Sequence, residues 1–374
     1  MTIKRGVSLY SYQQSQFFRE LDLEAQIREV GENLHGAEGI EIIDEMSLRY
    51  PDPGDAFVRQ WFGWMERYGT KPVTMDVGMD VLQFRDHVMS HEECAERLRY
   101  DIRLAKRLGF QNVRVLSVVP LDIMTRALPL CEELDIRLGK EIHQPMPLEG
   151  QQVTEIIDYA QRTGTRHLGI VPDFGIFQHR PTEVLLASFE RRGAKREACE
   201  ASVELAALIV ANEAPFPAVD MSYHTAGNVR SAFNRFLSTG AVEAEFVDTF
   251  NGIKAFASQR MTDPQTIDYV VVAEALMLSR TSSETLRQLT PYVVGVHGKF
   301  NNMSPVPDHP GQFQDIAIDY ATPVAALKAG GYDGYINTEY EGQRYSQDRG
   351  REDMADEVEQ VRRHQEMLRR LIGA

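Results

Sequence analysis

Four side chains that can bind a metal ion end or follow short apolar segments of the chain. They are Glu141 in GKEIHQ, Asp173 in GIVPDFG, His297 in VGVHGKF and Glu339 in INTEYEG. Any one of them alone would be explained as a helix cap or a loop anchor. Three carboxylates brought together without a cation would repel one another, whereas an oxygen-rich set with one imidazole suits Mn²⁺, Mg²⁺ or Co²⁺. We therefore predict that these residues bind one divalent metal ion.

Two further residues lie two positions beyond a predicted ligand, which places them on the same side of an extended strand. His143 follows Glu141 at this spacing, and Lys299 follows His297. An imidazole beside a metal ion can remove a proton from a bound substrate, so His143 is the predicted general base, with a purely orienting role as the alternative. Lys299 is a candidate for stabilising an oxyanion or binding a substrate hydroxyl, and a solvated loop lysine is its alternative.

The elements that would position these residues are short strands alternating with helices. Runs rich in β-branched and apolar residues predict eight strands: Arg5–Leu9, Gly39–Ile43, Pro72–Asp76, Asn112–Ser117, Ile136–Glu141, His167–Asp173, Tyr292–His297 and Gly334–Glu339. Ser90 and Glu93 have the capping-box spacing that begins one intervening helix. This alternation is typical of an α/β fold, the (β/α)8 TIM barrel. The carboxyl ends of the strands meet at one mouth in such a barrel, which would bring the four predicted ligands together.

The interval between the sixth and seventh predicted strands is far longer than its neighbours. One β/α unit cannot fill the stretch from Asp173 to His297, and Ala/Glu/Leu-rich sequences such as Arg196–Glu213 and Thr266–Ser279 predict helices within it. We expect residues 1–374 to form a single barrel domain with a helical insertion between strands six and seven, within about 181–290. Insertions at the carboxyl ends of barrel strands lie over the active site, so this one is expected to form a lid or a partner-docking surface.

Composition and missing motifs exclude several classes of function. The chain has 374 residues, a formal net charge of −15 and a pI of about 5.2, which opposes binding to nucleic acid. No apolar run is long enough to cross a bilayer, and the N-terminal MTIKRGVSLY lacks the features of a secretion signal, so we expect a cytoplasmic protein without membrane association. The three cysteines form no CxxC pair and are expected to be buried thiols. The sequence contains no phosphate-binding loop, dinucleotide fingerprint or serine-nucleophile elbow.

At the four predicted ligands the chain resembles the sugar phosphate isomerase/epimerase superfamily, the xylose-isomerase-like barrels. The resemblance covers nearly the whole chain except the insertion. It implies one divalent metal ion bound through Glu141, Asp173, His297 and Glu339. Many members have a substrate-binding histidine three residues after the aspartate, where this chain has Ile176. That departure puts an ordinary ketose-epimerase pocket in doubt.

Within the superfamily, five motifs are similar to the catalytic (alpha) subunits of bacterial C-glycoside deglycosidases. The motifs are RGVSLYSYQ, GKEIHQP, GIVPDFGIF, VHGKF and EYEG. This resemblance implies cleavage of the carbon–carbon bond between a 3-oxo-sugar and an aromatic aglycone, with manganese as the usual metal. It also implies a small beta subunit as partner in a hetero-oligomer, and His143 as the base.

The expected function is therefore a metal-dependent lyase that removes the C2 proton of a 3-oxo-C-glycoside and eliminates the aglycone. The alternative is a metal-dependent sugar or sugar-phosphate isomerase or epimerase, in which the same proton abstraction leads to an enediolate. A phosphodiesterase of the endonuclease-four type would need a histidine-rich zinc cluster and a basic face, and the chain offers neither. A sugar-binding module without activity would not explain three converging carboxylates.

Overall fold

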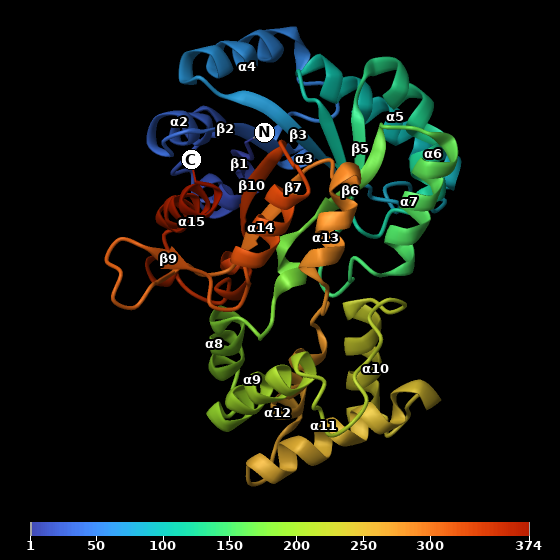
Figure 1. Ribbon diagram of the computed structural model, residues 1–374, viewed down its shortest axis with the longest axis vertical. Helices are drawn as coiled ribbons and strands as arrows, with labels where there is room; N and C mark the ends of the chain where they lie inside the picture. Colours follow the sequence, from blue (N-terminus) through green and yellow to red (C-terminus); the bar gives the residue numbers. More distant parts are fainter. Residues whose placement is uncertain (1, 374) are drawn as a thin grey trace.

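Eight parallel strands form the barrel that the sequence predicts (Figure 1). The computed structural model describes residues 2–373, so the two end residues of the expected 1–374 domain lie outside it. The strands are β1 (Lys4–Ser8), β2 (Ala37–Ile43), β3 (Lys71–Val77), β4 (Asn112–Val115), β5 (Arg137–Ile142), β6 (Leu168–Pro172), β7 (Val296–Phe300) and β10 (Tyr335–Tyr340). Their order is β6-β5-β4-β3-β2-β1-β10-β7, and parallel bridges from Ile170 to Val293 and from Asp173 to His297 close the ring. The predicted (β/α)8 barrel is confirmed.

The seventh strand is the one whose predicted position was wrong. The sequence predicted Tyr292–His297, but β7 spans Val296–Phe300. Pro291 lies in a short 3₁₀ turn, η5 (Thr290–Tyr292), so regular pairing with the neighbouring strand begins later. His297 and Lys299 therefore both lie inside β7. The other seven strands match their predicted bounds to within one or two residues.

An outer layer of helices covers the barrel (Figure 1). These helices are α2 (Leu23–Asn33), α4 (Gly54–Tyr68), α5 (His91–Arg107), α6 (Leu121–Leu134), α7 (Gln151–Thr163), α13 (Ser283–Leu289), α14 (Ala321–Ala329) and α15 (Glu357–Ile372), with two short helices, α1 (Gln13–Phe17) and α3 (Asp44–Ser47), at the barrel mouth. The predicted capping box begins α5, where Ser90 and Glu93 bond reciprocally. Leu98 and Ile102 on the inner face of α5 are fully buried, and each contributes about 1.5–3 kcal/mol to stability.

The predicted helical insertion is present between β6 and β7. It comprises α8 (Glu183–Arg191), α9 (Arg196–Val210), α10 (Ala226–Thr239), α11 (Val247–Arg260), α12 (Thr266–Ala273) and a 3₁₀ turn, η4 (Glu274–Leu276). These helices pack around a hydrophobic core of their own, separate from the core between the barrel and its outer helices. In Figure 1 they extend away from the barrel as a distinct layer. Polar contacts such as Gln144 Nε2 to Met277 O, at 2.6 Å, tie the insertion to the loop after β5.

Three smaller observations complete the fold. After β7, β8 (Ser304–Pro305) and β9 (Phe313–Gln314) form a two-stranded antiparallel pair. Cys94, Cys131 and Cys199 are buried free thiols, as the sequence predicts. Among residues 2–373, none of the helices has both the length and the apolar character needed to span a bilayer.

Candidate metal centre

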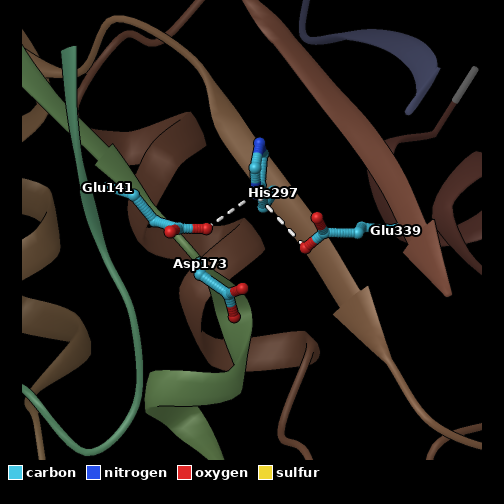
Figure 2. Close-up of side chains that lie close together, drawn as sticks. All are labelled: Glu141, Asp173, His297 and Glu339. Atoms are coloured by element: carbon cyan, nitrogen blue, oxygen red, sulfur yellow. Dashed lines mark ion pairs between the residues drawn. The ribbon is translucent and has the colours of Figure 1, made fainter. Parts of the chain in front are cut away.

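The barrel brings the four predicted ligands into one cluster. Glu141 comes from β5, Asp173 directly follows β6, His297 lies in β7 and Glu339 lies in β10, so four strands that neighbour one another around the ring supply one residue each. One donor atom from each residue lies within 4.8 Å of the donor atoms of the other three, and all four side chains are buried. Figure 2 shows Glu141 and Glu339 approaching the imidazole of His297 from opposite sides, with Asp173 between them.

The arrangement of polar atoms in this cluster fits a divalent cation. Nδ1 of His297 lies 3.2 Å from Oε1 of Glu141 and 3.2 Å from Oε2 of Glu339. Among the described residues, neither His297 Nδ1 nor Glu339 Oε2 has a well-directed hydrogen-bond partner, although both atoms are buried. Asp173 accepts a hydrogen bond from the Gly175 N–H at 2.6 Å, which fixes the orientation of its carboxylate. Buried polar atoms without partners are costly, and a cation among these oxygens would satisfy them.

The titration behaviour of the cluster reflects its excess of carboxylates. Burial disfavours the imidazolium, but the charges of Glu339 and Glu41 raise the pKa of His297 well above its usual range. Burial opposes ionisation of Glu141, yet the Arg114 guanidinium holds the pKa of that carboxyl well below its usual range. Burial likewise opposes ionisation of Glu339, and the charge of His297 lowers its pKa to about 2. Two ionised carboxylates thus lie against one imidazole.

The predicted base and the predicted lysine are in direct contact beside this cluster. Nδ1 of His143 lies 2.6 Å from the backbone oxygen of Gln144, which can only accept a hydrogen bond. The proton of a neutral imidazole therefore lies on Nδ1, and the Nε2 lone pair accepts a hydrogen bond from Nζ of Lys299 at 2.8 Å. Nε2 is also 3.9 Å from Asp173 Oδ2. The strand β5 ends one residue before His143, so the expected strand continuation was wrong, but the imidazole still reaches the cluster.

Lys299 is a buried residue of β7, so its interpretation as a solvated loop lysine was wrong. Its ammonium lies 3.4 Å from Asp173 Oδ2 and forms an ion pair with Glu341. Burial disfavours the charged form, but Asp173 and Glu341 outweigh it and raise the pKa of Lys299. Sequence reasoning missed Glu341, although it follows Glu339 at the same two-residue spacing that identified Lys299.

A cavity of about 120 Å³ opens beside the His143–Lys299 pair. Barrel residues line one side of it and the insertion supplies the other. The lining includes Asn301, Glu341 and Arg344 from the barrel with Leu185, Arg230 and Glu274 from the insertion. Arg230 and Glu274 form an ion pair within the insertion at 2.6 Å. A volume near 120 Å³ is enough for one small ring, so a substrate with a second ring must extend toward solvent or move the insertion.

A second charged layer lies deeper in the barrel, and sequence reasoning missed two of its members, Glu41 and Arg114. Arg114 bonds to Asp76 through two contacts of 3.0 and 3.1 Å, and it lies 3.7 Å from Glu141. Glu41 lies 3.2 Å from Nε2 of His297. Glu41 lies two residues before the end of β2 and Arg114 one residue before the end of β4, so neither follows its strand. Alternation of side chains along β2 and β4 is the signal that would have found them.

Comparison with known proteins agrees with the predicted resemblance. No family model matches the chain. The chain is 27% identical to the 3'-dehydrocarminate deglycosidase alpha subunit of a Microbacterium species, over 98% of this chain and 95% of that protein. It is 28% identical to a C-glycoside deglycosidase alpha subunit of Arthrobacter globiformis, over 90% of this chain and 84% of that protein.

Likeness to solved structures is more remote. L-ribulose 3-epimerase shares 12% identity with a TM-score of 0.48, over 99% of this chain and 95% of that one. The closed ring of parallel strands confirms the (β/α)8 barrel expected from the sequence, and the relatives of higher identity match the chain over nearly its whole length. The chain is thus a distant homologue of the C-glycoside deglycosidase alpha subunits.

Proposed function

We propose that this protein is a metal-dependent lyase that cleaves the carbon–carbon glycosidic bond of 3-oxo-C-glycosides. The observation that carries the proposal is the contact of 2.8 Å between His143 Nε2 and Lys299 Nζ, directly beside the buried carboxylate–imidazole cluster. A lone pair that can accept a proton thus lies beside a fixed positive charge. Both lie next to a site suited to a divalent cation. The names of the relatives support the choice of substrate.

Glu141, Asp173, Glu339 and Nδ1 of His297 would hold the metal ion, with manganese as our first choice and magnesium or cobalt as alternatives. A bound divalent ion supplies Lewis acidity, which draws electron density from a coordinated oxygen and makes the neighbouring C–H bond more acidic. Four buried ligands from four strands form a rigid site, so little ordering is required when the ion binds.

His143 is the base in this mechanism. The hydrogen bond from Nδ1 to the Gln144 carbonyl holds the ring so that the Nε2 lone pair, which accepts from Lys299 Nζ in the structure, lies beside the metal cluster, and the ammonium must release this lone pair before it can take a proton. His143 takes the C2 proton of the 3-oxo-sugar, and the electron pair of that C–H bond delocalises onto the 3-oxo oxygen. The ammonium of Lys299 places a positive charge next to this developing enolate. Its pairing with Asp173 and Glu341 keeps it protonated.

Elimination completes the reaction. The enolate electrons form the C1–C2 double bond while the bond from C1 to the aromatic carbon breaks. The departing carbon, or a phenol conjugated with it, takes up a proton, so the products are an unsaturated 3-oxo-sugar and the free aglycone. The proton held by His143 balances the one that the aglycone gains.

A metal-dependent sugar isomerase or epimerase is the second candidate because it uses the same proton abstraction. Ile176 is one observation against an ordinary ketose epimerase. It lies three residues after Asp173 and is almost fully buried, so it offers no hydrogen bond to a sugar hydroxyl. A direct test incubates the protein and Mn²⁺ with a 3-oxo-C-glycoside and with simple ketoses. Aglycone release supports the lyase, whereas ketose epimerisation without any aglycone release would overturn it.

A partner subunit is part of the proposal, because the relatives are named as alpha subunits. We propose a hetero-oligomer with a small beta subunit. Large apolar side chains exposed at the end of α1, which follows β1, and on the loops after β3 and β4 support a docking surface on the half of the barrel mouth that lacks the insertion. Phe17 is 78% exposed, Leu82 68% and Val118 76%. Exposed apolar side chains gathered on one side of a protein are typical of interaction sites.

A further inference from the structure

The imidazole of His297 is held between two groups of carboxylates, one facing each ring nitrogen. Nδ1 faces Glu141 and Glu339 at 3.2 Å each, while Nε2 faces Glu41 Oε1 at 3.2 Å. A neutral imidazole carries one N–H and one lone pair. Which nitrogen carries the hydrogen therefore decides whether Nδ1 can coordinate a metal ion at the candidate centre. Nothing on the Glu141 side selects that tautomer, since carboxylates there accept hydrogen bonds and bind metal ions equally well.

The side of the ring that faces Glu41 is suited to a hydrogen bond and not to a second metal ion. Glu41, Asp76 and His297 are close enough to resemble a further cation site. However, Arg114 already forms a buried ion pair with Asp76, in which Nη2 donates to Oδ2 at 3.1 Å and Nε lies 3.0 Å from Oδ1, so its guanidinium supplies the positive charge of this layer. Glu41 is fully buried, and among the described residues its Oε1 has no well-directed hydrogen-bond partner, so it is free to accept an N–H.

The Glu41 carboxylate is held in place for this role by Asn337 of β10. Asn337 Nδ2 donates to Oε2 of Glu41 at 2.7 Å, which turns Oε1 toward His297. Gly6 of β1 makes room for that amide, because a Cβ at residue 6 would lie 2.1 Å from Asn337 Oδ1. The Asn337 side chain, in the space that Gly6 leaves open, thus fixes the orientation of Glu41.

We propose that Glu41 is a positioning residue, which accepts the Nε2–H of His297 and thereby directs the Nδ1 lone pair at the metal site. The inference rests on the proposed metal-dependent function but assigns a role outside the four ligands. A carboxylate that accepts the second N–H of a ligating histidine fixes the tautomer and raises the basicity of the ligand. Loss of such a partner costs about 10–100-fold in metal affinity.

The test compares Mn²⁺ affinity in the full chain for wild type, Glu41→Ala, Glu41→Gln and the control Glu38→Gln. Glu38 lies on the same strand and bonds to Lys71 and Tyr335, away from the cluster. Calorimetric titration should show a loss of about 10–100-fold for Glu41→Ala. Glu41→Gln should bind nearly as tightly as wild type, because its amide oxygen still accepts the N–H. Asn337 can turn its unpartnered Oδ1 toward the new NH₂. The control should be unchanged.

A second measurement excludes a loss that merely reflects poor folding. In Mg²⁺-loaded protein with ¹⁵N-labelled histidine, wild type and Glu41→Gln should show His297 protonated at Nε2. Glu41→Ala should lose that signal or show the other tautomer. Equal Mn²⁺ affinity in wild type and Glu41→Ala, or a hydrogen on Nδ1 in wild type, would overturn the role of Glu41 and leave the proposed function standing. A wild-type protein that binds no divalent ion would contradict both.

Discussion

Lys299 Nζ donates a hydrogen bond to His143 Nε2 over 2.8 Å, although Lys299 lies in β7 and His143 directly follows β5, far away in the sequence. The same ammonium is paired with Asp173 and Glu341, so it remains charged while it contacts the lone pair of the base. A base next to a fixed cation is weaker than a free imidazole, but it needs to act only on a C–H bond already made acidic by the bound ion. In the proposed mechanism the pair would therefore link proton abstraction with stabilisation of the charge that results.

Replacing His143 should separate metal binding from proton abstraction. We expect His143→Ala to keep its Mn²⁺ affinity and to lose C2 deuterium exchange on a 3-oxo-glycoside by about 10²–10⁴-fold, the usual contribution of a general base. Exchange is followed by NMR in D₂O. His167→Ala is the matched control, because His167 contacts Asp135 on the opposite end of the barrel. Undiminished exchange in His143→Ala would show that His143 is not the base that removes the C2 proton.

Removing the charge of Lys299 should slow the reaction without emptying the metal site. Lys299→Met keeps much of the side-chain volume and should lower kcat by about 10²–10³-fold, the range found when one electrostatic stabiliser is lost. Metal content is measured in parallel by mass spectrometry. Since the change leaves Glu341 without its buried partner, the midpoint of thermal unfolding should also fall. A variant with wild-type kcat would show that the ammonium has no part in the chemistry.

His364 of α15 predicts a pH dependence of stability. Tyr320 donates to the backbone oxygen of Lys299 at 2.6 Å, so its oxygen must accept from His364 Nε2, while Thr338 Oγ1 lies 2.8 Å from Nδ1. Burial lowers the pKa of His364 to about 3. In the unfolded chain His364 takes up a proton near pH 6.5, whereas in the folded protein it stays neutral until the pH approaches 3. The contribution of His364 to the free energy of unfolding is therefore complete above about pH 6.5 and is lost as the pH falls toward 3.

The expected loss is about 1.4 kcal/mol for each pH unit in that window. Urea unfolding of wild type and His364→Gln at pH 7.5 and pH 5.0 measures it. The difference in free energy of unfolding between the two proteins should be larger at pH 7.5 than at pH 5.0, because glutamine does not titrate. Other buried groups, such as Glu357, whose pKa burial raises to about 7, change the free energy of unfolding equally in both proteins. Their contributions therefore cancel in this difference. An equal difference at both pH values would show that His364 is protonated in the folded protein.

The apolar loops at the barrel mouth predict where the partner subunit binds. Leu82→Glu and Val118→Glu each place a charge on an exposed apolar position and should weaken the complex with the beta subunit by at least tenfold, with no effect on Mn²⁺ affinity. Size-exclusion chromatography with co-expressed subunits measures the complex. Val210→Glu, on an exposed position of the insertion, is the control. Complexes of unchanged affinity in both loop variants would locate the partner elsewhere.

The sequence predicted the barrel and its cluster because both depend on local patterns. Short β-branched runs set the strands, and parallel strands in a closed barrel must bring residues such as Glu141 and Glu339 to one mouth. Pro291 displaced the start of the seventh strand, so local apolar character alone was misleading there. Glu41 could not be assigned in advance, because its role depends on the register between β1, β2 and β10. The helices of the insertion were predicted, but the place of Arg230 in the cavity wall was not. It depends on how the insertion packs against the barrel, and helix periodicity carries no information about that packing.

In the proposed function, Glu141, Asp173, His297 and Glu339 hold a single divalent ion that activity requires. Elemental analysis of active, dialysed protein by mass spectrometry tests this most directly, alongside the variant His297→Ala. The account predicts about one equivalent of a divalent transition metal or magnesium per chain in wild type, and loss of both metal and activity in the variant. Fully active wild-type protein without stoichiometric metal would contradict it.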